Sequence, residues 1–131
     1  MRRQTAAVLL FGLTTLFAAG CGGGGEEAPE LAPVTGVVTI NGQPVEGLML
    51  RFQPEAGRES QGKTDAEGRY ELVHVSGEDG AELGRHVVRF EYDDPAEAPQ
   101  EIPAEYNVES QESATVQEGE NTFDFNLEIA Q

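Results

Sequence analysis

The sequence is poor in the residues from which catalytic and metal sites are usually built. It has one cysteine, two histidines and no tryptophan among 131 residues. The single cysteine, Cys21, cannot form an intramolecular disulfide. A blue-copper site takes two histidines and a cysteine, and it fails here because Cys21 belongs to the N-terminal leader described below. A zinc site would have to use His74, His86 and carboxylates, and we expect no metal and no cofactor.

Basic residues are also scarce. Eight Lys and Arg stand against 24 Asp and Glu, and the formal net charge at pH 7 is −16. A domain with this charge is repelled by the phosphates of nucleic acids and by anionic lipid head groups. We therefore expect no nucleic-acid partner, and we interpret the charge as a feature that keeps the domain soluble.

No serine has the sequence context of a catalytic nucleophile. The elbow Gly-x-Ser-x-Gly is absent around Ser60, Ser76, Ser110 and Ser113. Without tryptophan the chain also has little to stack against a sugar ring, which weakens a glycosidase hypothesis based on paired carboxylates. We predict that the protein is not an enzyme, and an envelope hydrolase is the least favoured alternative.

Residues 1–20 have the three parts of a secretory signal peptide. Arg2 and Arg3 form a positive start, Ala6 to Phe17 form an apolar run, and small residues precede Cys21. The apolar run has about 12 residues, whereas a membrane-spanning helix needs about 20. Residues 1–20 are therefore predicted to be a cleaved signal peptide and not a permanent membrane span.

The end of this leader, Leu16–Cys21, resembles the bacterial lipobox. The match lies in Ala19, Gly20 and Cys21, and it departs at Ala18, where leucine is more usual. The resemblance implies that Cys21 is linked by a thioether to diacylglycerol and becomes the mature N-terminus. The membrane is then a partner through the lipid on Cys21. Cleavage after Gly20 by an ordinary signal peptidase, without lipid, is the alternative.

Residues 21–33 are predicted to be a lipidated cysteine followed by a flexible tether. Glycines 22–25 give flexibility, and the glutamates and prolines after them extend the chain. By resemblance to Gram-negative lipoproteins, Gly22 in place of an aspartate retention signal favours the outer membrane. The sequence therefore predicts a domain of residues 34–131 held in the cell envelope by a lipid anchor.

Alternation of apolar and polar residues dominates this domain and predicts strands. The residues expected to face inward are Val38 and Ile40; Leu48, Leu50 and Phe52; Tyr70, Leu72 and His74; His86, Val88, Phe90 and Tyr92; Ala114 and Val116; and Phe123, Phe125, Leu127 and Ile129. A further short strand is expected at residues 61–64, and no segment has the period of an amphipathic helix. His74 and His86 fall on the apolar side, so we expect structural histidines and not catalytic bases.

Turn residues separate the strands. Asn41-Gly42 predicts a two-residue type I′ hairpin, which needs positive φ at both central residues. Asp65–Gly68 joins the strand at 61–64 to a strand that begins at Arg69, and Gly119–Asn121 separates the last two strands. These elements predict an all-β fold, an antiparallel β-sandwich of about seven strands.

The turns also carry a family resemblance. Val37–Gly47 and Thr64–Tyr70 resemble the carboxypeptidase regulatory-like domain, in which an Asn-Gly-x-Pro turn precedes a Thr-Asp-x-x-Gly-x-Tyr hairpin. The resemblance implies a transthyretin-like, immunoglobulin-like sandwich. With Ile102–Tyr106 and the run Asn121–Leu127, the chain is similar to small lipoproteins of planctomycetes. The motif residues are Asn41, Gly42, Thr64, Asp65, Gly68 and Tyr70.

The needs of the fold account for these motif residues without a ligand. Gly68 permits positive φ, Asp65 can accept hydrogen bonds from amides of the turn, and Tyr70 can bury its ring while its hydroxyl stays in water. We therefore interpret them as structural turn residues.

Two functional hypotheses follow for residues 34–131. The first is a non-catalytic accessory or interaction domain that binds an envelope protein, with the proline-rich loop from Asp93 to Tyr106 as the place to seek a binding surface. The second is a module that binds calcium or another small ligand through loop carboxylates, because calcium prefers oxygen ligands. The acidic pairs in question are Asp65 and Glu67, Glu78 and Asp79, and Asp93 and Asp94.

Overall fold

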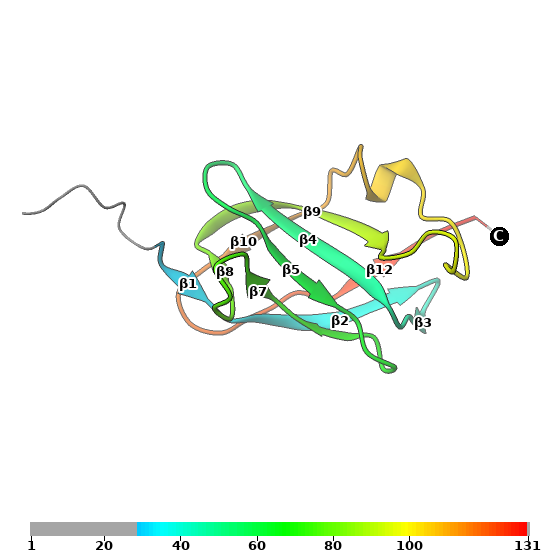
Figure 1. The fold of residues 1–131 in the computed structure, drawn as a ribbon, viewed down its shortest axis with the longest axis horizontal. Helices are drawn as coiled ribbons and strands as arrows, with labels where there is room; N and C mark the ends of the chain where they lie inside the picture. The colour runs from blue at the N-terminus through cyan, green and yellow to red at the C-terminus, as the bar shows by residue number, and fades with distance from the viewer. Residues whose placement is uncertain (1–28, 131) are drawn as a thin grey trace, which may run out of the picture.

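Each segment that alternation predicts to be a strand contains one in the structure, a computed structural model that describes residues 29–130. The strands form an all-β sandwich, so the predicted fold class is confirmed. Figure 1 shows the two layers, with β4, β5 and β9 in one and β2 in the other. Among the described residues, no helix is long and apolar enough to cross a membrane.

The larger sheet has five antiparallel strands in the order β10-β9-β4-β5-β7. They are β4 (Leu48–Pro54), β5 (Ser60–Lys63), β7 (Val73–His74), β9 (Gly84–Tyr92) and β10 (Ser113–Val116). β4 and β9 form the centre of the sheet and alternate buried with more exposed residues. Leu48, Leu50, Phe52, Val88 and Phe90 are fully buried, as the period of two along a strand requires.

The second sheet is built around β2 (Val34–Ile40). β3 (Gln43–Pro44) and β6 (Arg69–Glu71) pair with β2 antiparallel, whereas β11 (Asn121–Thr122) and β12 (Phe125–Leu127) pair with it in parallel. The parallel pairing differs from the wholly antiparallel arrangement that the sequence predicts. It arises because the chain reaches β2 by crossing over from β10 in the other sheet, and such a crossover permits parallel neighbours.

The Asn41-Gly42 turn has the predicted geometry. Asn41 has φ of 51° and Gly42 has φ of 81°, and Ile40 pairs directly with Gln43 across the two-residue loop. The type I′ hairpin is therefore confirmed. Asn41 has a second role that the sequence does not predict, because its side chain exchanges two hydrogen bonds of 2.9 and 3.0 Å with the backbone of Ile129.

A short pairing extends the fold into the segment predicted to be a tether. β1 (Leu31–Ala32) pairs antiparallel with β8 (Ala81–Glu82), and Ala32 is 3% exposed. The sheet structure therefore begins three residues before the expected boundary at Val34. The predicted signal peptide (1–20), the lipobox with Cys21, and most of the tether lie outside the described residues.

Two predicted strands are each divided in the structure. The first division falls at Leu72, between β6 and β7, which belong to different sheets. The Leu72 amide donates to the Val34 carbonyl at 3.0 Å, and the Leu72 carbonyl accepts from Gly80 at 2.8 Å. Leu72 is fully buried, so the chain crosses from one sheet to the other through the core.

The second division falls at Phe123, between β11 and β12. The Tyr70 hydroxyl donates to the Phe123 carbonyl oxygen at 2.6 Å. The expectation of a solvent-exposed hydroxyl is wrong, because Tyr70 is 3% exposed and its hydroxyl bonds to protein. Burial, and after it the negative charge of Asp124, raises the pKa of Tyr70 above its ordinary value of 10.0.

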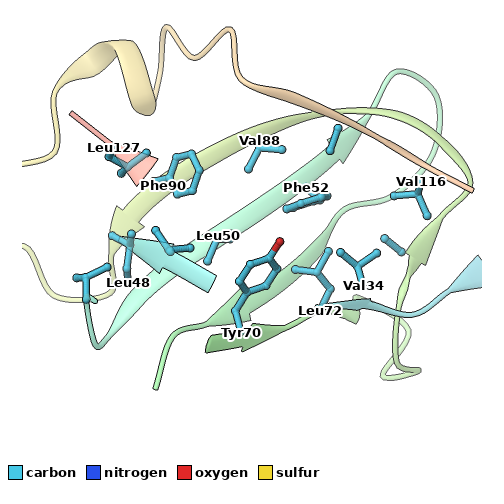
Figure 2. Close-up of a cluster of buried hydrophobic side chains, with 14 of the residues drawn as sticks. Val34, Leu48, Leu50, Phe52, Tyr70, Leu72, Val88, Phe90, Val116 and Leu127 are labelled. Carbon is cyan, nitrogen blue, oxygen red and sulfur yellow. The ribbon is translucent and has the colours of Figure 1, made fainter. Parts of the chain in front are cut away.

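The core lies between the sheets and is rich in aromatic rings. Figure 2 shows Phe52 of β4 and Tyr70 of β6 among the buried side chains, with Leu127 of β12 beside Phe90. The ring of Phe52 is 6.4 Å from that of Tyr70, and Phe90 packs edge-on against Phe125 at 5.2 Å. Both sheets therefore contribute aromatic side chains to the same cluster.

Gly36→Ala tests the close packing of β2 against the backbone at Phe123. A β-carbon at Gly36 would overlap the Phe123 carbonyl oxygen, so we expect the free energy of unfolding to fall by at least about 3 kcal/mol. Urea denaturation measures the loss. The control is Thr35→Ala, which alters the exposed neighbour on the same strand and should cost under about 0.5 kcal/mol. Equal losses for the two variants would contradict the packing argument.

Candidate functional site

The longest segment without a strand in residues 29–130 runs from Asp93 to Glu112. It contains the predicted loop Asp93–Tyr106 and one short 3₁₀ helix, η1 (Ala104–Tyr106). Figure 1 shows this segment in yellow and orange at the end of the sandwich opposite β1. The loop and the N-terminal strand therefore occupy opposite ends of the domain.

The loop is held in place by specific contacts. The Tyr106 hydroxyl accepts from the Glu128 amide at 3.0 Å and donates to the Glu128 carbonyl at 3.3 Å. Its ring packs edge-on against Phe90 at 6.4 Å. Ser110 donates its hydroxyl to the Val88 carbonyl, and Asp94 accepts from the Ala96 amide at 2.9 Å. These contacts give the loop a defined shape.

Three hollows in the described part of the chain border the loop, and the walls of two of them also include strand residues. The first of these two, of about 760 Å³, lies between the β2–β3 hairpin and the loop residues Pro99 and Gln100, and Ile129 forms part of its wall. The second, of about 480 Å³, lies between the end of β9 and the loop, with Tyr92 and Ile102 in its wall. The loop predicted to be a binding surface thus borders concave regions.

Tyr92, in the wall of the second hollow, has a hydroxyl group that makes no hydrogen bond to the described residues. The hydroxyl is buried, and a buried hydroxyl without a partner is unfavourable by about 1–3 kcal/mol.

A buried polar cluster occupies the other end of the domain. His74 contacts the Glu82 carboxylate through Nε2 and the Ser76 hydroxyl through Nδ1, each at 2.9 Å. The Arg58 amide donates to the Glu82 carboxylate at 2.7 Å, and His86 Nε2 donates to the Glu82 carbonyl at 2.7 Å. Glu82 therefore joins four segments of the chain.

The cluster places a hydroxyl, an imidazole and a carboxylate in the order of a serine hydrolase triad, with Ser76 exposed and His74 buried. The His74 side chain is 2% exposed, and both of its ring nitrogens are engaged. The amide of Ser76 also donates to Nδ1, as in a local turn. The burial predicted for His74 and His86 is confirmed, at 3% and 0% exposure.

Electrostatics favour the charged form of Glu82. Burial acts to raise its pKa, but the hydrogen bond from the Arg58 amide and the contacts with His74 outweigh burial. The pKa of Glu82 therefore lies below its ordinary value of 4.5. Hydrogen bonds to an ionised carboxylate are stronger than those between neutral groups, so Glu82 stabilises the folded state.

The turn motif residues behave as structural residues. Asp65 accepts from the amides of Glu67 and Arg69 at 2.9 Å each, and Gly68 has φ of 78°. The Thr64 hydroxyl accepts from the Leu48 amide at 2.9 Å and is buried. The predicted turn chemistry of Asp65 and Gly68 is confirmed.

The acidic loop pairs do not converge. Within residues 29–130, no group of three or more His, Cys, Asp or Glu lies close enough to hold a metal ion. Asp65 and Asp94 each accept hydrogen bonds from backbone amides of their own turns, and Lys63 lies 3.7 Å from Asp93. The geometry therefore offers no observation in favour of the calcium hypothesis.

No family model matches the chain, and no curated protein is significantly similar to it. The resemblances to the lipobox and to the carboxypeptidase regulatory-like domain therefore stay predictions. The features of the described residues that bear on function are the loop, the hollows beside it and the position of β1.

Glu82→Gln should lower stability in a pH-dependent way. Because the folded-state pKa of Glu82 is lowered, its contribution is fully present above 4.5 and is lost as pH falls through the folded-state pKa. We expect the variant to be less stable by about 1–3 kcal/mol at neutral pH and the difference to shrink in acid. Denaturation between about pH 7 and pH 3 measures this.

Glu78→Gln is the control for that series, because it removes an exposed carboxylate of the same charge from the adjacent turn. Its stability should run parallel to that of the unmodified protein across the pH range. If the loss of stability caused by Glu82→Gln grew as pH fell, the lowered pKa of Glu82 in the folded state would be contradicted.

Proposed function

We propose that this chain is a lipid-anchored protein of the cell envelope whose sandwich is a non-catalytic interaction domain. The lipid is attached at Cys21 after removal of residues 1–20, and the loop Asp93–Tyr106 is the binding surface for an envelope protein. The lipobox resemblance and the outer-membrane expectation from Gly22 support the location.

The observation that carries the proposal is the opposite placement of β1 and the loop (Figure 1). Leu31 follows Cys21 by ten residues, which span at most about 35 Å when extended. An anchor at Cys21 would therefore keep the β1 end within about 35 Å of the bilayer and leave the loop end free to face outward. A partner in the envelope would then have access to the loop.

A binding role is supported further by the state of the histidines. General-base catalysis needs a side chain within reach of a substrate proton. Both histidines of the chain are buried, and His74 and His86 each bind the Glu82 segment. His74 and His86 thus stabilise the fold through their bonds to Glu82. The hollows lie elsewhere, beside the loop Asp93–Tyr106.

We also propose that the domain is a carboxypeptidase regulatory-like, transthyretin-like sandwich. The type I′ turn at Asn41-Gly42 and the Asp65–Gly68 turn support this assignment, because both have the geometry that the motif needs. This likeness concerns the fold, and fold alone implies no activity.

Cys21→Ser tests the anchor. Removing the sulfur atom prevents thioether formation, so we expect the protein to move from the membrane fraction to the soluble fraction of the envelope. Fractionation with immunoblotting measures the shift, and mass spectrometry of the N-terminal peptide identifies the lipid. A free thiol on Cys21 in the unmodified protein would refute acylation.

Photo-crosslinking in cells tests the loop. A photoreactive amino acid in place of Val108, which is 72% exposed and lies two residues after the end of the loop, should capture a specific protein. The same substitution at Val75, which is 41% exposed and follows β7, is the matched control. The same adduct from both positions, or none from Val108, would remove the loop from consideration.

A further inference from the structure

Charge is distributed very unevenly along the domain. Every Lys and Arg of the described residues lies between Arg51 and Arg89. Residues 90–131 hold no Lys, Arg or His, and their acidic residues are Glu91, Asp93, Asp94, Glu97, Glu101, Glu105, Glu109, Glu112, Glu118, Glu120, Asp124 and Glu128. The loop belongs to this region and therefore carries a strong negative potential.

Only the entry to the loop is neutralised by cations. Arg51 pairs with Glu91 at 2.5 Å, and Lys63 lies 3.7 Å from Asp93. The other carboxylates of residues 90–130 have no ion pair within the described part of the chain. The loop end therefore presents acidic side chains whose charge the protein does not balance.

Both hollows combine an apolar wall with an acidic residue. The walls of the first include Ile40, Pro44, Val45, Pro99 and Ile129, together with Glu46. The second hollow has Tyr92, Pro95 and Ile102 beside Glu101. Such a surface suits a ligand with both apolar and positively charged side chains.

We infer that the loop end is a docking surface for an extended, lysine- and arginine-rich segment of a partner protein. The inference rests on the proposed function and adds the chemistry of the partner. Apolar side chains of the segment enter the two hollows. Its cationic groups meet Glu46 and Glu101 in their walls, and Glu128 in an adjoining hollow. The adjoining hollow shares Asn41 and Ile129 with the first.

Charge complementarity selects this occupant over others. A second copy of the chain is repelled, because the formal net charge is −16. A single metal ion needs converging ligands, and the carboxylates of the described residues do not converge. A partner with several positive charges spaced along an extended chain matches carboxylates that are themselves spread out.

Binding of this kind depends strongly on salt. Exposed charge pairs are individually weak, and they are screened beyond about 10 Å at 0.1 M salt. The acidic surface should therefore accelerate encounter with a cationic segment, while the apolar hollows lengthen the lifetime of the complex.

The test uses the full chain carrying Cys21→Ser and a fluorescent peptide of alternating lysine and valine. Fluorescence anisotropy should show binding that weakens as salt rises. The triple variant Glu46→Gln, Glu101→Gln, Glu128→Gln should bind the peptide about tenfold more weakly, as expected for three exposed charge pairs. A peptide with glutamate in place of lysine should not bind.

The matched control is Glu78→Gln, Glu118→Gln, Glu120→Gln, which removes the same charge from three exposed residues away from the hollows. It should lower affinity less than twofold. Equal losses for the two triple variants would show that net charge alone attracts the peptide and would overturn the docking surface. Failure of the lysine peptide to bind would overturn it as well.

This test and the anchor test fail independently. The Cys21→Ser chain carries no lipid, so an unacylated Cys21 leaves the peptide result unaffected. Loss of peptide binding, in turn, leaves both the membrane fractionation and any crosslink at Val108 in place and refutes only the cationic nature of the partner.

Discussion

The sandwich depends on the close approach of three backbone segments at Gly36, Tyr70 and Phe123. The Tyr70 hydroxyl donates a hydrogen bond to the Phe123 carbonyl, which lies in the gap between β11 and β12. Gly36 has to be glycine because a β-carbon would occupy the space of that carbonyl. This one junction joins β2, β6 and the segment between β11 and β12.

The sequence predicts those features that depend on neighbouring residues. The period of two gives the buried faces of β4 and β9, and Asn41-Gly42 and Gly68 give their turns because positive φ is a local requirement. The sequence does not predict contacts between distant residues. Asn41 binds Ile129 from 88 positions away, and the Tyr70 hydroxyl finds a carbonyl 53 positions away, contrary to its expected exposure.

The same distinction applies to the candidate sites. The loop after β9 is recognisable from its prolines and from the lack of alternation, so its place in the fold is predictable. The hollows beside it are not predictable, because their walls come from β2, β3 and the C-terminal segment as well. The parities of His74 and His86 predict their burial, but the link through Glu82 depends on β8, a two-residue strand too short to show a period.

The parallel pairing of β12 with β2 has a consequence for the order of events in the cell. Ile40 pairs with Leu127, so the central strand of the second sheet lacks one neighbour until residues 125–127 have been synthesised. Folds dominated by such distant pairings form slowly. If the chain is exported as proposed, slow closure of the sandwich would keep it unfolded long enough to pass through a secretion channel.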